Sequence, residues 1–434
     1  MKNAEDSRFR WIVVGVSFAT LALSYTVMYS FSVFFVALLK EFGWRRSLTA
    51  GAFSVFWVLH GLVGPFVGSM VDRFGPRRVF VLGSLLLGAA LALCGSVRSW
   101  WQFYLYFSFI AAAGVASTGW VPNATVIQNW FKERRGLAMG IISSGVGTGI
   151  FICIPSIQLL INRVGWRTAY RVMALVIPLF IVSMAAFFLK RRPPVSPVAS
   201  PIGEPGPASA GAPEAADGKD GLQGLTLRQA VSTNTFAALG ICFFFSGSIT
   251  QSVLTHHMAF FVDQGLDALS ASYIVGLTGI VSIAGKVFWG TLSDKIGREA
   301  TYGLVVSCST CGLLSLIFFA NRPLSSLPFL YAVFFGLGYA GIASLAPLIT
   351  ADFFAGRAYG RIFGTLYALN GIGGAFAVWF AGFFYDQAGS YVPFFSIMIA
   401  CGLLVCLIVW IAAPRTVRRT AAKTSKIVKL KSPK

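Results

Sequence analysis

The chain has 434 residues, of which 56% are hydrophobic and only 12% are charged, and its formal net charge is +20. A water-soluble domain needs more polar surface than this, since about a quarter of its residues are usually charged. The long, continuous apolar runs also exclude an outer-membrane barrel, whose strands alternate over about 10 residues. The composition therefore predicts a protein with many membrane-spanning helices.

The apolar runs predict twelve such helices, six in each part of the chain. A helix needs about 20 residues to cross the hydrocarbon layer of a bilayer. Reading the runs between charged or Pro- and Gly-containing breaks gives spans at residues 11–39, 47–71, 79–97, 101–129, 136–161, 169–189, 235–262, 269–292, 300–320, 326–351, 360–385 and 391–413.

A segment of different composition separates the sixth span from the seventh. Residues 190–230 are rich in Pro, Ala, Gly and Ser and carry scattered acids. Such a segment buries little apolar surface, so it predicts a flexible linker. We expect an N-terminal six-helix bundle over 1–189, the linker over 190–230, a C-terminal six-helix bundle over 231–413 and a basic tail over 414–434.

The positions of the basic residues predict the orientation. With the N-terminus inside, 26 of the 35 Lys and Arg residues fall in inside segments and 8 in outside loops. Cytoplasmic loops of membrane proteins are enriched in basic residues. We therefore expect a multi-pass protein of the cytoplasmic (inner) membrane with both termini and the linker in the cytoplasm. Topology then accounts for nearly all of the net charge, so no nucleic-acid partner is expected, and the tail can contact anionic lipids of the bilayer.

A loop motif occurs at matching places in the two halves. Gly68-x-x-x-Asp72-Arg73-x-Gly75-x-Arg77-Arg78 follows the second span, and Gly290-x-x-x-Asp294-Lys295-x-Gly297-Arg298 follows the eighth, 222 residues later. Carboxylates and cations at helix ends can bond neighbouring helix ends or each other. We therefore predict a gating and scaffold role for Gly68, Asp72, Arg73, Gly75, Arg77, Arg78, Gly290, Asp294, Lys295, Gly297 and Arg298, with Arg134 and Arg135 as basic partners.

The repetition indicates two pseudo-symmetric halves, an arrangement in which transporters bind substrate between the halves near the midplane. The full loop motif and the twelve spans resemble the major facilitator superfamily. Two further segments, Glu41-Phe42-Gly43-Trp44 and the run from Trp130 to Gly140, resemble the monocarboxylate porter family and the related oxalate/formate exchangers. The resemblance implies an all-α membrane fold of two six-helix bundles, and transport of small organic anions such as lactate or pyruvate.

Lys286 is the only charged residue well inside a predicted span. It lies eight residues before Asp294, about 12 Å from the inner end of its helix and near the midplane. A charge at this depth costs roughly 3 kcal/mol or more, so it should face a cavity or a partner. Every Asp and Glu maps to a loop, a tail or a span end. We therefore predict that Lys286 binds the anion, and a single cation suits a substrate with one carboxylate.

The resemblance bears on this site in two ways. In the porter family the corresponding position commonly carries Arg, so Lys286 keeps the charge but loses the bidentate fork. Some family members carry an acidic residue four positions earlier, implicated in proton coupling, where this sequence has Ser282. The proton carrier then stays open between Lys286 and His256, which lies on a polar side of the seventh span. His60 is interpreted as structural.

Polar and aromatic residues at mid-span complete the predicted substrate site. A small-anion site needs a few polar groups from several helices, and Asn370, being neutral, argues against a dicarboxylate. The candidates besides Lys286 and His256 are Ser282, Asn370, Asn123, Trp120, Tyr29, Tyr339 and Phe335.

These features favour a secondary active transporter that moves a small monocarboxylate by alternating access, as a monomer and with a proton. Exchange of anions and efflux of a drug-like molecule remain alternatives within transport. A membrane sensor without transport is the alternative of a different class. No catalytic constellation, cofactor motif or metal-ligand spacing is present in the sequence, and the seven cysteines lie in apolar runs. We therefore expect neither an enzyme nor a cofactor nor a metal site.

Overall fold

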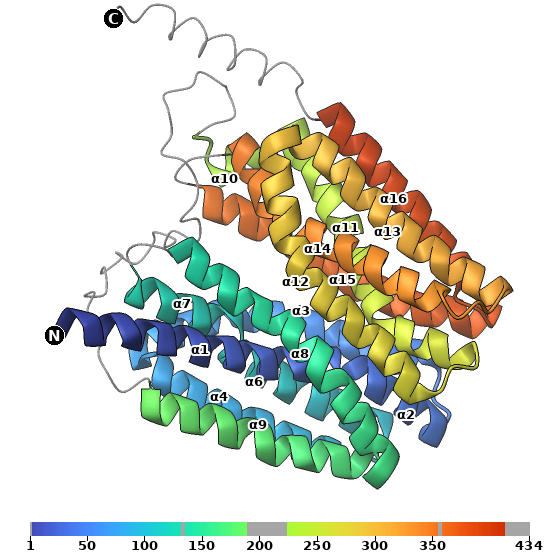
Figure 1. The fold of residues 1–434 in the computed structure, drawn as a ribbon, viewed down its shortest axis with the longest axis horizontal. Helices are drawn as coiled ribbons and strands as arrows, with labels where there is room; N and C mark the ends of the chain where they lie inside the picture. The colour runs from blue at the N-terminus through green and yellow to red at the C-terminus, as the bar shows by residue number, and fades with distance from the viewer. Residues whose placement is uncertain (1, 132–134, 189–223, 355–357, 413–434) are drawn as a thin grey trace, which may run out of the picture.

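The computed structural model describes residues 2–131, 135–188, 224–354 and 358–412 (Figure 1). Within these ranges the chain is helical apart from short connections, and no strand is present. Twelve helical segments are long and apolar enough to cross a membrane, and their ends lie within four residues of the predicted spans. The predicted all-α fold with twelve spans is confirmed.

The helices divide between two halves (Figure 1). The N-terminal half contains α1 (Lys2–Tyr29), α2 (Phe31–Phe42), α3 (Arg46–Phe74), α4 (Pro76–Cys94), α5 (Trp100–Phe103), the π-helical η1 (Tyr104–Ala111), α6 (Ala112–Thr118), α7 (Trp120–Trp130), α8 (Arg135–Val164) and α9 (Trp166–Phe188). The C-terminal half contains α10 (Leu227–Val231), α11 (Asn234–Asp263), α12 (Ala268–Ile296), α13 (Arg298–Asn321), α14 (Leu327–Phe354), α15 (Tyr359–Ala388) and α16 (Val392–Ala412).

The two ends of the bundle differ in how the halves meet. We name the end at which α1 begins the amino face, and the end at which α2 finishes the distal face. The halves pack along three helix pairs, chiefly α3 with α15 and α8 with α12, and also α2 with α11. Figure 1 shows the halves coming together toward the distal face and spreading apart toward the amino face.

Two glycines allow the close crossing of α8 and α12. A Cβ atom on Gly147 would lie 2.7 Å from the carbonyl oxygen of Gly279, and a Cβ atom on Gly279 would lie 2.7 Å from the carbonyl oxygen of Gly147. Small residues at a helix contact in a membrane let two backbones approach closely. This glycine pair is therefore a direct backbone contact between the halves.

The fourth span departs from the single helix that was predicted. It contains the π-helical η1, and it breaks at Gly119 between α6 and α7. Pro122 has no N–H to offer the carbonyl of Thr118. The side-chain amide of Asn123 instead donates to the carbonyl oxygens of Thr118 at 3.0 Å and Gly119 at 2.7 Å. The amide of Asn123 thus supplies the donor that the break in the helix removes.

The end of the predicted linker is folded. Thr226 and Gln229 form a capping box at the start of α10, which packs against α11 and α15. Folded structure therefore begins before the predicted boundary at residue 231. The rest of the predicted linker, through residue 223, and the predicted tail over 414–434 lie outside the described residues.

The repeated loop motifs occupy equivalent helix junctions at the amino face. Gly75 between α3 and α4 and Gly297 between α12 and α13 both have positive φ, 79° and 97°, which glycine adopts without steric cost. Arg298 of α13 pairs with Asp294 of α12 at 2.7 Å and with Asp352 of α14 at 3.4 Å. The second motif therefore ties three helices of one half together.

The remaining motif residues make fewer contacts. Arg77, Arg78 and Lys295 are exposed, and the guanidinium of Arg73 lies 5.3 Å from the ring centre of Phe74. A Cβ atom at Gly290 would meet nothing within 4 Å, and one at Gly68 would meet only Val121. Arg134 and the side chains of Asp72 and Arg135 lie outside the described part of the chain.

Candidate substrate site

Lys286 lies in the middle of α12, half-buried and ten residues before the end of the helix at the amino face. Ten residues of helix correspond to about 15 Å, half of a hydrocarbon core of about 30 Å. The Nζ atom lies 6.0 Å from the ring centre of Tyr339. No carboxylate of the described residues lies within 4 Å of it. Lys286 is therefore a mid-span cation with no acidic partner in that part of the chain.

Two features of α12 hold this lysine close to α14. A Cβ atom at Gly285 would lie 2.8 Å from the Cβ atom of Ala340, so the missing side chain lets the two helices approach. The indole N–H of Trp289 donates to the carbonyl oxygen of Leu337 at 2.8 Å. The backbone position of Lys286 is thus fixed on both sides along the helix.

Tyr339, the tyrosine beside this lysine, belongs to a group of four tyrosines from both halves. The hydroxyl of Tyr339 lies 3.2 Å from the hydroxyl of Tyr29 on α1, and this hydrogen bond joins the two halves. The ring of Tyr25 lies 6.4 Å from the ring of Tyr29, and Tyr25 lies within electrostatic range of Tyr339 and Tyr367. Tyr367 is 53% exposed. We name Tyr25, Tyr29, Tyr339 and Tyr367 the tyrosine cluster.

Half of the tyrosine cluster was predicted. Tyr29 and Tyr339 were candidates, whereas Tyr25 and Tyr367 were not. Tyr25 could have been found, because it lies four residues before Tyr29 and so on the same face of the helix. Tyr367 carries no comparable signal, since its proximity to Tyr25 depends on how the two halves pack.

None of the other mid-span candidates is hydrogen-bonded to Lys286 in the described part of the chain. The hydroxyl of Ser282 donates to the carbonyl oxygen of Gly279 in its own helix at 2.7 Å. The amide of Asn370 donates to the carbonyl oxygen of Phe243, which ties α15 to α11. Phe335 stacks on Tyr331 inside the C-terminal half. Trp120 is 39% exposed, and Asn123 stabilises the helix break described above.

His256 lies fully buried near the distal face. Its Nδ1 atom is 2.8 Å from the hydroxyl of Tyr391, and its Nε2 atom is 2.9 Å from the carbonyl oxygen of Val378. Its ring also meets the ring of Phe35 from the N-terminal half edge to face, with 5.2 Å between the ring centres. Both ring nitrogens are therefore in use, and neither contacts Lys286.

A group of polar residues joins the halves at the distal face, and we name it the distal clamp. Arg46 of α3 pairs with Asp263 at 2.6 Å and donates to the hydroxyl of Tyr391 at 2.8 Å. Asp386 of α15 accepts from the backbone N–H groups of Arg46 and Ser47, each at 2.9 Å, and from the hydroxyl of Ser47. The clamp was not predicted, because its charged residues lie at the ends of spans, where charge was attributed to the orientation of the protein in the membrane.

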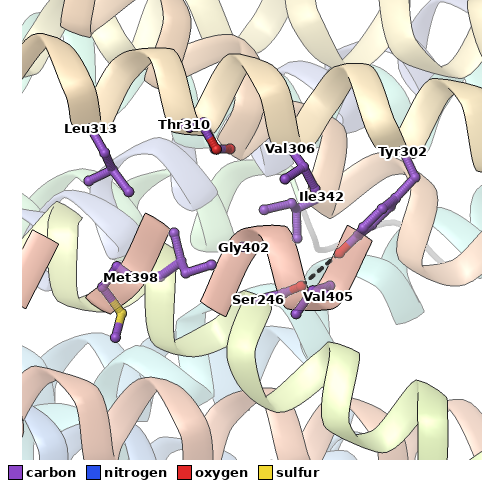
Figure 2. A pocket seen from close by; sticks show the side chains of 11 residues that line it. Ser246, Tyr302, Val306, Thr310, Leu313, Ile342, Met398, Gly402 and Val405 are labelled. Atoms are coloured by element: carbon purple, nitrogen blue, oxygen red, sulfur yellow. Dashed lines mark hydrogen bonds between the residues drawn. The ribbon is translucent and has the colours of Figure 1, made fainter. Parts of the chain in front are cut away.

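A small pocket lies apart from these groups, inside the C-terminal half (Figure 2). Side chains of α11, α13, α14 and α16 line it, and the hydroxyls of Ser246 and Tyr302 are hydrogen-bonded at 3.0 Å within it. Its other lining residues are mostly apolar, and no charged side chain reaches it. The pocket therefore offers no site for an anion. The described residues also contain no cluster of three or more His, Cys, Asp or Glu side chains that could hold a metal ion.

Comparison with known proteins places the chain in a family. The sequence profile of the Major Facilitator Superfamily matches residues 17–350. Monocarboxylate transporter 13 of Rattus norvegicus is 24% identical over 408 residues, which cover 93% of this chain and 90% of that protein. Monocarboxylate transporter 12 of Xenopus laevis is 24% identical over 437 residues, which cover 94% and 90% of the two chains.

A solved structure shares the fold. It is a bacterial homologue of the human lysosomal transporter Spinster in an inward-facing and occupied conformation. It superposes with a TM-score of 0.71 at 12% identity, over 93% of this chain and 97% of that one. The family and the fold point to a membrane transporter rather than an enzyme, and the chain belongs to the major facilitator superfamily.

Proposed function

We propose that this transporter moves a small monocarboxylate of the lactate or pyruvate type, and that Lys286 binds its carboxylate. The observation that carries the proposal is the mid-span position of Lys286, without an acidic partner in the described residues and beside a hydrogen bond that joins the halves. An unpaired charge at this depth is costly, so a bound anion stabilises it. The relatives named monocarboxylate transporters support the same substrate class.

The tyrosine cluster suits the rest of such a substrate. Tyr29 and Tyr339 each carry one hydroxyl that can donate to a carboxylate oxygen or accept from a substrate hydroxyl. A carboxylate between Lys286 and these hydroxyls would replace a neutral hydrogen bond by charge-assisted ones, which are shorter and stronger. The site would then contact its substrate from both halves, as alternating access between two bundles requires.

The distribution of basic residues supports a cytoplasmic amino face under the positive-inside rule, and we propose an inner-membrane protein with this orientation. We also propose that it acts as a monomer. Symport with a proton is the coupling that we propose, with Lys286 as the ionisable group beside the substrate. Exchange of one anion for another is the second candidate. Ser282 favours exchange, because this position offers a hydroxyl bonded to its own helix and no carboxylate to take a proton.

Uptake of radiolabelled lactate and pyruvate into proteoliposomes tests the proposal. We expect Lys286→Gln to lower uptake at least tenfold, because a loss of about 1.4 kcal/mol in binding already gives that factor. Lys40→Gln, which removes an exposed lysine at the end of α2, should leave uptake unchanged. Full uptake by a folded Lys286→Gln protein would refute the site.

The same vesicles separate the two modes of coupling. An inwardly directed proton gradient should accelerate uptake into empty vesicles if a proton accompanies the anion. Preloading the vesicles with unlabelled anion should accelerate uptake without a pH gradient if the protein exchanges anions. Uptake into empty vesicles decides between them, since a symporter needs only the proton gradient, whereas an obligate exchanger needs anion inside the vesicle.

A further inference from the structure

The hydrogen bonds around His256 fix which atoms donate. The carbonyl oxygen of Val378 can only accept, so the Nε2 atom of His256 carries a proton and donates to it at 2.9 Å. In the neutral ring the Nδ1 atom then accepts, and the hydroxyl of Tyr391 donates to it at 2.8 Å. The oxygen of Tyr391 is left to accept from the guanidinium of Arg46, also at 2.8 Å. One ordered chain thus runs from Arg46 through Tyr391 and His256 to Val378.

This chain of hydrogen bonds crosses between the halves. Arg46 belongs to α3 of the N-terminal half, whereas Tyr391, His256 and Val378 belong to the C-terminal half. Tyr391 is 1% exposed and His256 is 0% exposed, so water does not reach these two side chains in this arrangement. The orientation of the Tyr391 hydroxyl, and with it one bond of the distal clamp, depends on a free lone pair at Nδ1 of His256.

A proton on Nδ1 is incompatible with this arrangement. The protonated ring has two N–H donors and no acceptor, so Tyr391 would lose its acceptor and face N–H groups from both His256 and Arg46. The new positive charge would also be separated from the guanidinium of Arg46 only by the hydroxyl of Tyr391. The ring of His256 is buried, so water screens this repulsion little. Both effects weaken the joint between the halves.

We propose that His256 is a positioning residue of the distal clamp, whose neutral form holds Tyr391 for Arg46 and whose protonation from the distal side releases the clamp. The closed clamp excludes the proton and the open clamp accepts it, so acid on the distal side favours the open form. His256 acts here through Tyr391 and does not contact Lys286. The inference does not depend on the identity of the substrate.

This role differs from that of a carrier for a transported proton. A carrier must keep its proton while the distal face closes, whereas closure here requires neutral His256. If the distal face is the outer one, as the basic residues indicate, acid outside the cell would expose the substrate site to the outside.

Other ionisable groups belong to the clamp or lie next to it. Asp263 pairs with Arg46, and Asp386 accepts from α3, so protonation of either carboxylate would also weaken the joint. Tyr385, whose ring lies 3.6 Å from the guanidinium of Arg46, also adjoins the clamp. His257 bonds only Tyr331 within the C-terminal half. His256→Gln removes the imidazole and leaves all of these groups in place, so a difference between its pH response and that of the wild type reports on His256.

Distances between spin labels test the proposal directly in the full-length protein in lipid nanodiscs. Labels introduced as unnatural amino acids at Arg98 and Ser325, both exposed in loops of the distal face, leave the seven native cysteines in place. Electron–electron double resonance gives the open and closed populations without added substrate. One proton bound only by the open form changes their ratio by up to tenfold per pH unit.

We expect the wild-type protein to open as the pH falls from 8 to 5.5, and His256→Gln to lose this response. Gln stays neutral over this range. His257→Gln is the matched control, since it changes the adjacent buried histidine outside the clamp, and it should respond as the wild type does. Tyr391→Phe, which removes the hydroxyl and leaves His256 in place, should be more open at pH 8 and respond less.

Three results would overturn the proposal. These are a wild-type distribution that does not change with pH, an unchanged response in His256→Gln, and an equal loss of response in His257→Gln. If His256→Gln does not fold, the pH response of Tyr391→Phe alone tests the proposal. A response as large as that of the wild type then refutes the role of the hydrogen-bond chain from Arg46 to Val378.

Discussion

Asp386→Ala should shift the protein toward a form with an open distal face. The α3 helix begins after Arg45, whose side chain makes no cap hydrogen bond. Asp386 supplies the missing acceptor from the opposite half, through the N–H groups of Arg46 and Ser47 and the hydroxyl of Ser47. A helix start capped by a residue of the other half is satisfied only while the halves touch at this face.

The magnitude follows from the cost of losing a helix cap. Replacing a capping side chain by Ala costs about 0.5–2 kcal/mol, and because Asp386 is exposed we expect about 1 kcal/mol, in the lower half of this range. The bonds exist only in the closed form, so nearly all of this cost falls on the equilibrium between closed and open forms. A change of about 1 kcal/mol moves the ratio roughly fivefold toward the open form.

The labels at Arg98 and Ser325 measure this ratio at pH 7.5. The control is Asp267→Ala, because Asp267 caps α12 on the same face by accepting from the N–H groups of Leu269 and Ser270 within its own half. It should destabilise the fold by a similar amount and leave the ratio unchanged. An equal shift in both variants, or no shift in Asp386→Ala, would refute the reasoning that the cap joins the halves.

Two further predictions test other parts of the fold. Gly147→Ala should slow uptake and lower the melting temperature, because its Cβ atom would lie 2.7 Å from the carbonyl oxygen of Gly279 and such crowding costs about 1–3 kcal/mol. The control is Gly140→Ala on the same helix, where a Cβ atom meets nothing within 4 Å, and it should behave as the wild type. Equal effects of the two substitutions would contradict the close crossing of α8 and α12. Hydrogen bonds from the side chain and backbone of Ser270 lower the pKa of Asp267, so its contribution to stability is present above about pH 4 and is lost as the pH falls through the lower folded-state pKa. Denaturation of Asp267→Asn should therefore differ from that of the wild type at pH 7 and converge with it below pH 4, and a constant difference would exclude this linkage.

The fold could be predicted because each span obeys a local constraint. A helix in hydrocarbon must satisfy its own backbone and present an apolar surface of fixed length. This is why the predicted ends lie close to the observed ones. The break at Gly119 escaped prediction, because hydropathy is insensitive to whether a carbonyl is bonded by the next turn or by the amide of Asn123.

The site was predictable only where one residue is unusual by itself. Lys286 stands out in its span, and its position near the middle of α12 agrees with the predicted depth. Ser282 and Asn370 were plausible candidates by depth, but the direction of a polar side chain depends on which carbonyl lies nearest, and both bond backbone groups instead. Arg46 and Asp263 lie 217 residues apart, and their pairing becomes visible only once the halves are packed.

Cross-half contacts lie at several depths, from the distal face to the level of the predicted anion site. The distal clamp is at the face, the contact of His256 with Phe35 lies below it, and the hydrogen bond between Tyr29 and Tyr339 lies beside Lys286. The ribbons of the halves spread apart toward the amino face (Figure 1). A carboxylate bound between Lys286 and this hydrogen bond would contact both halves, where it can favour closure on the amino side by neutralising Lys286. Lys286→Gln separates this step from the clamp, because it removes the charge and leaves the clamp intact. If substrate and proton act at these two different depths, Lys286→Gln should lose uptake. Its distances between the spin labels should still respond to pH as those of the wild type do.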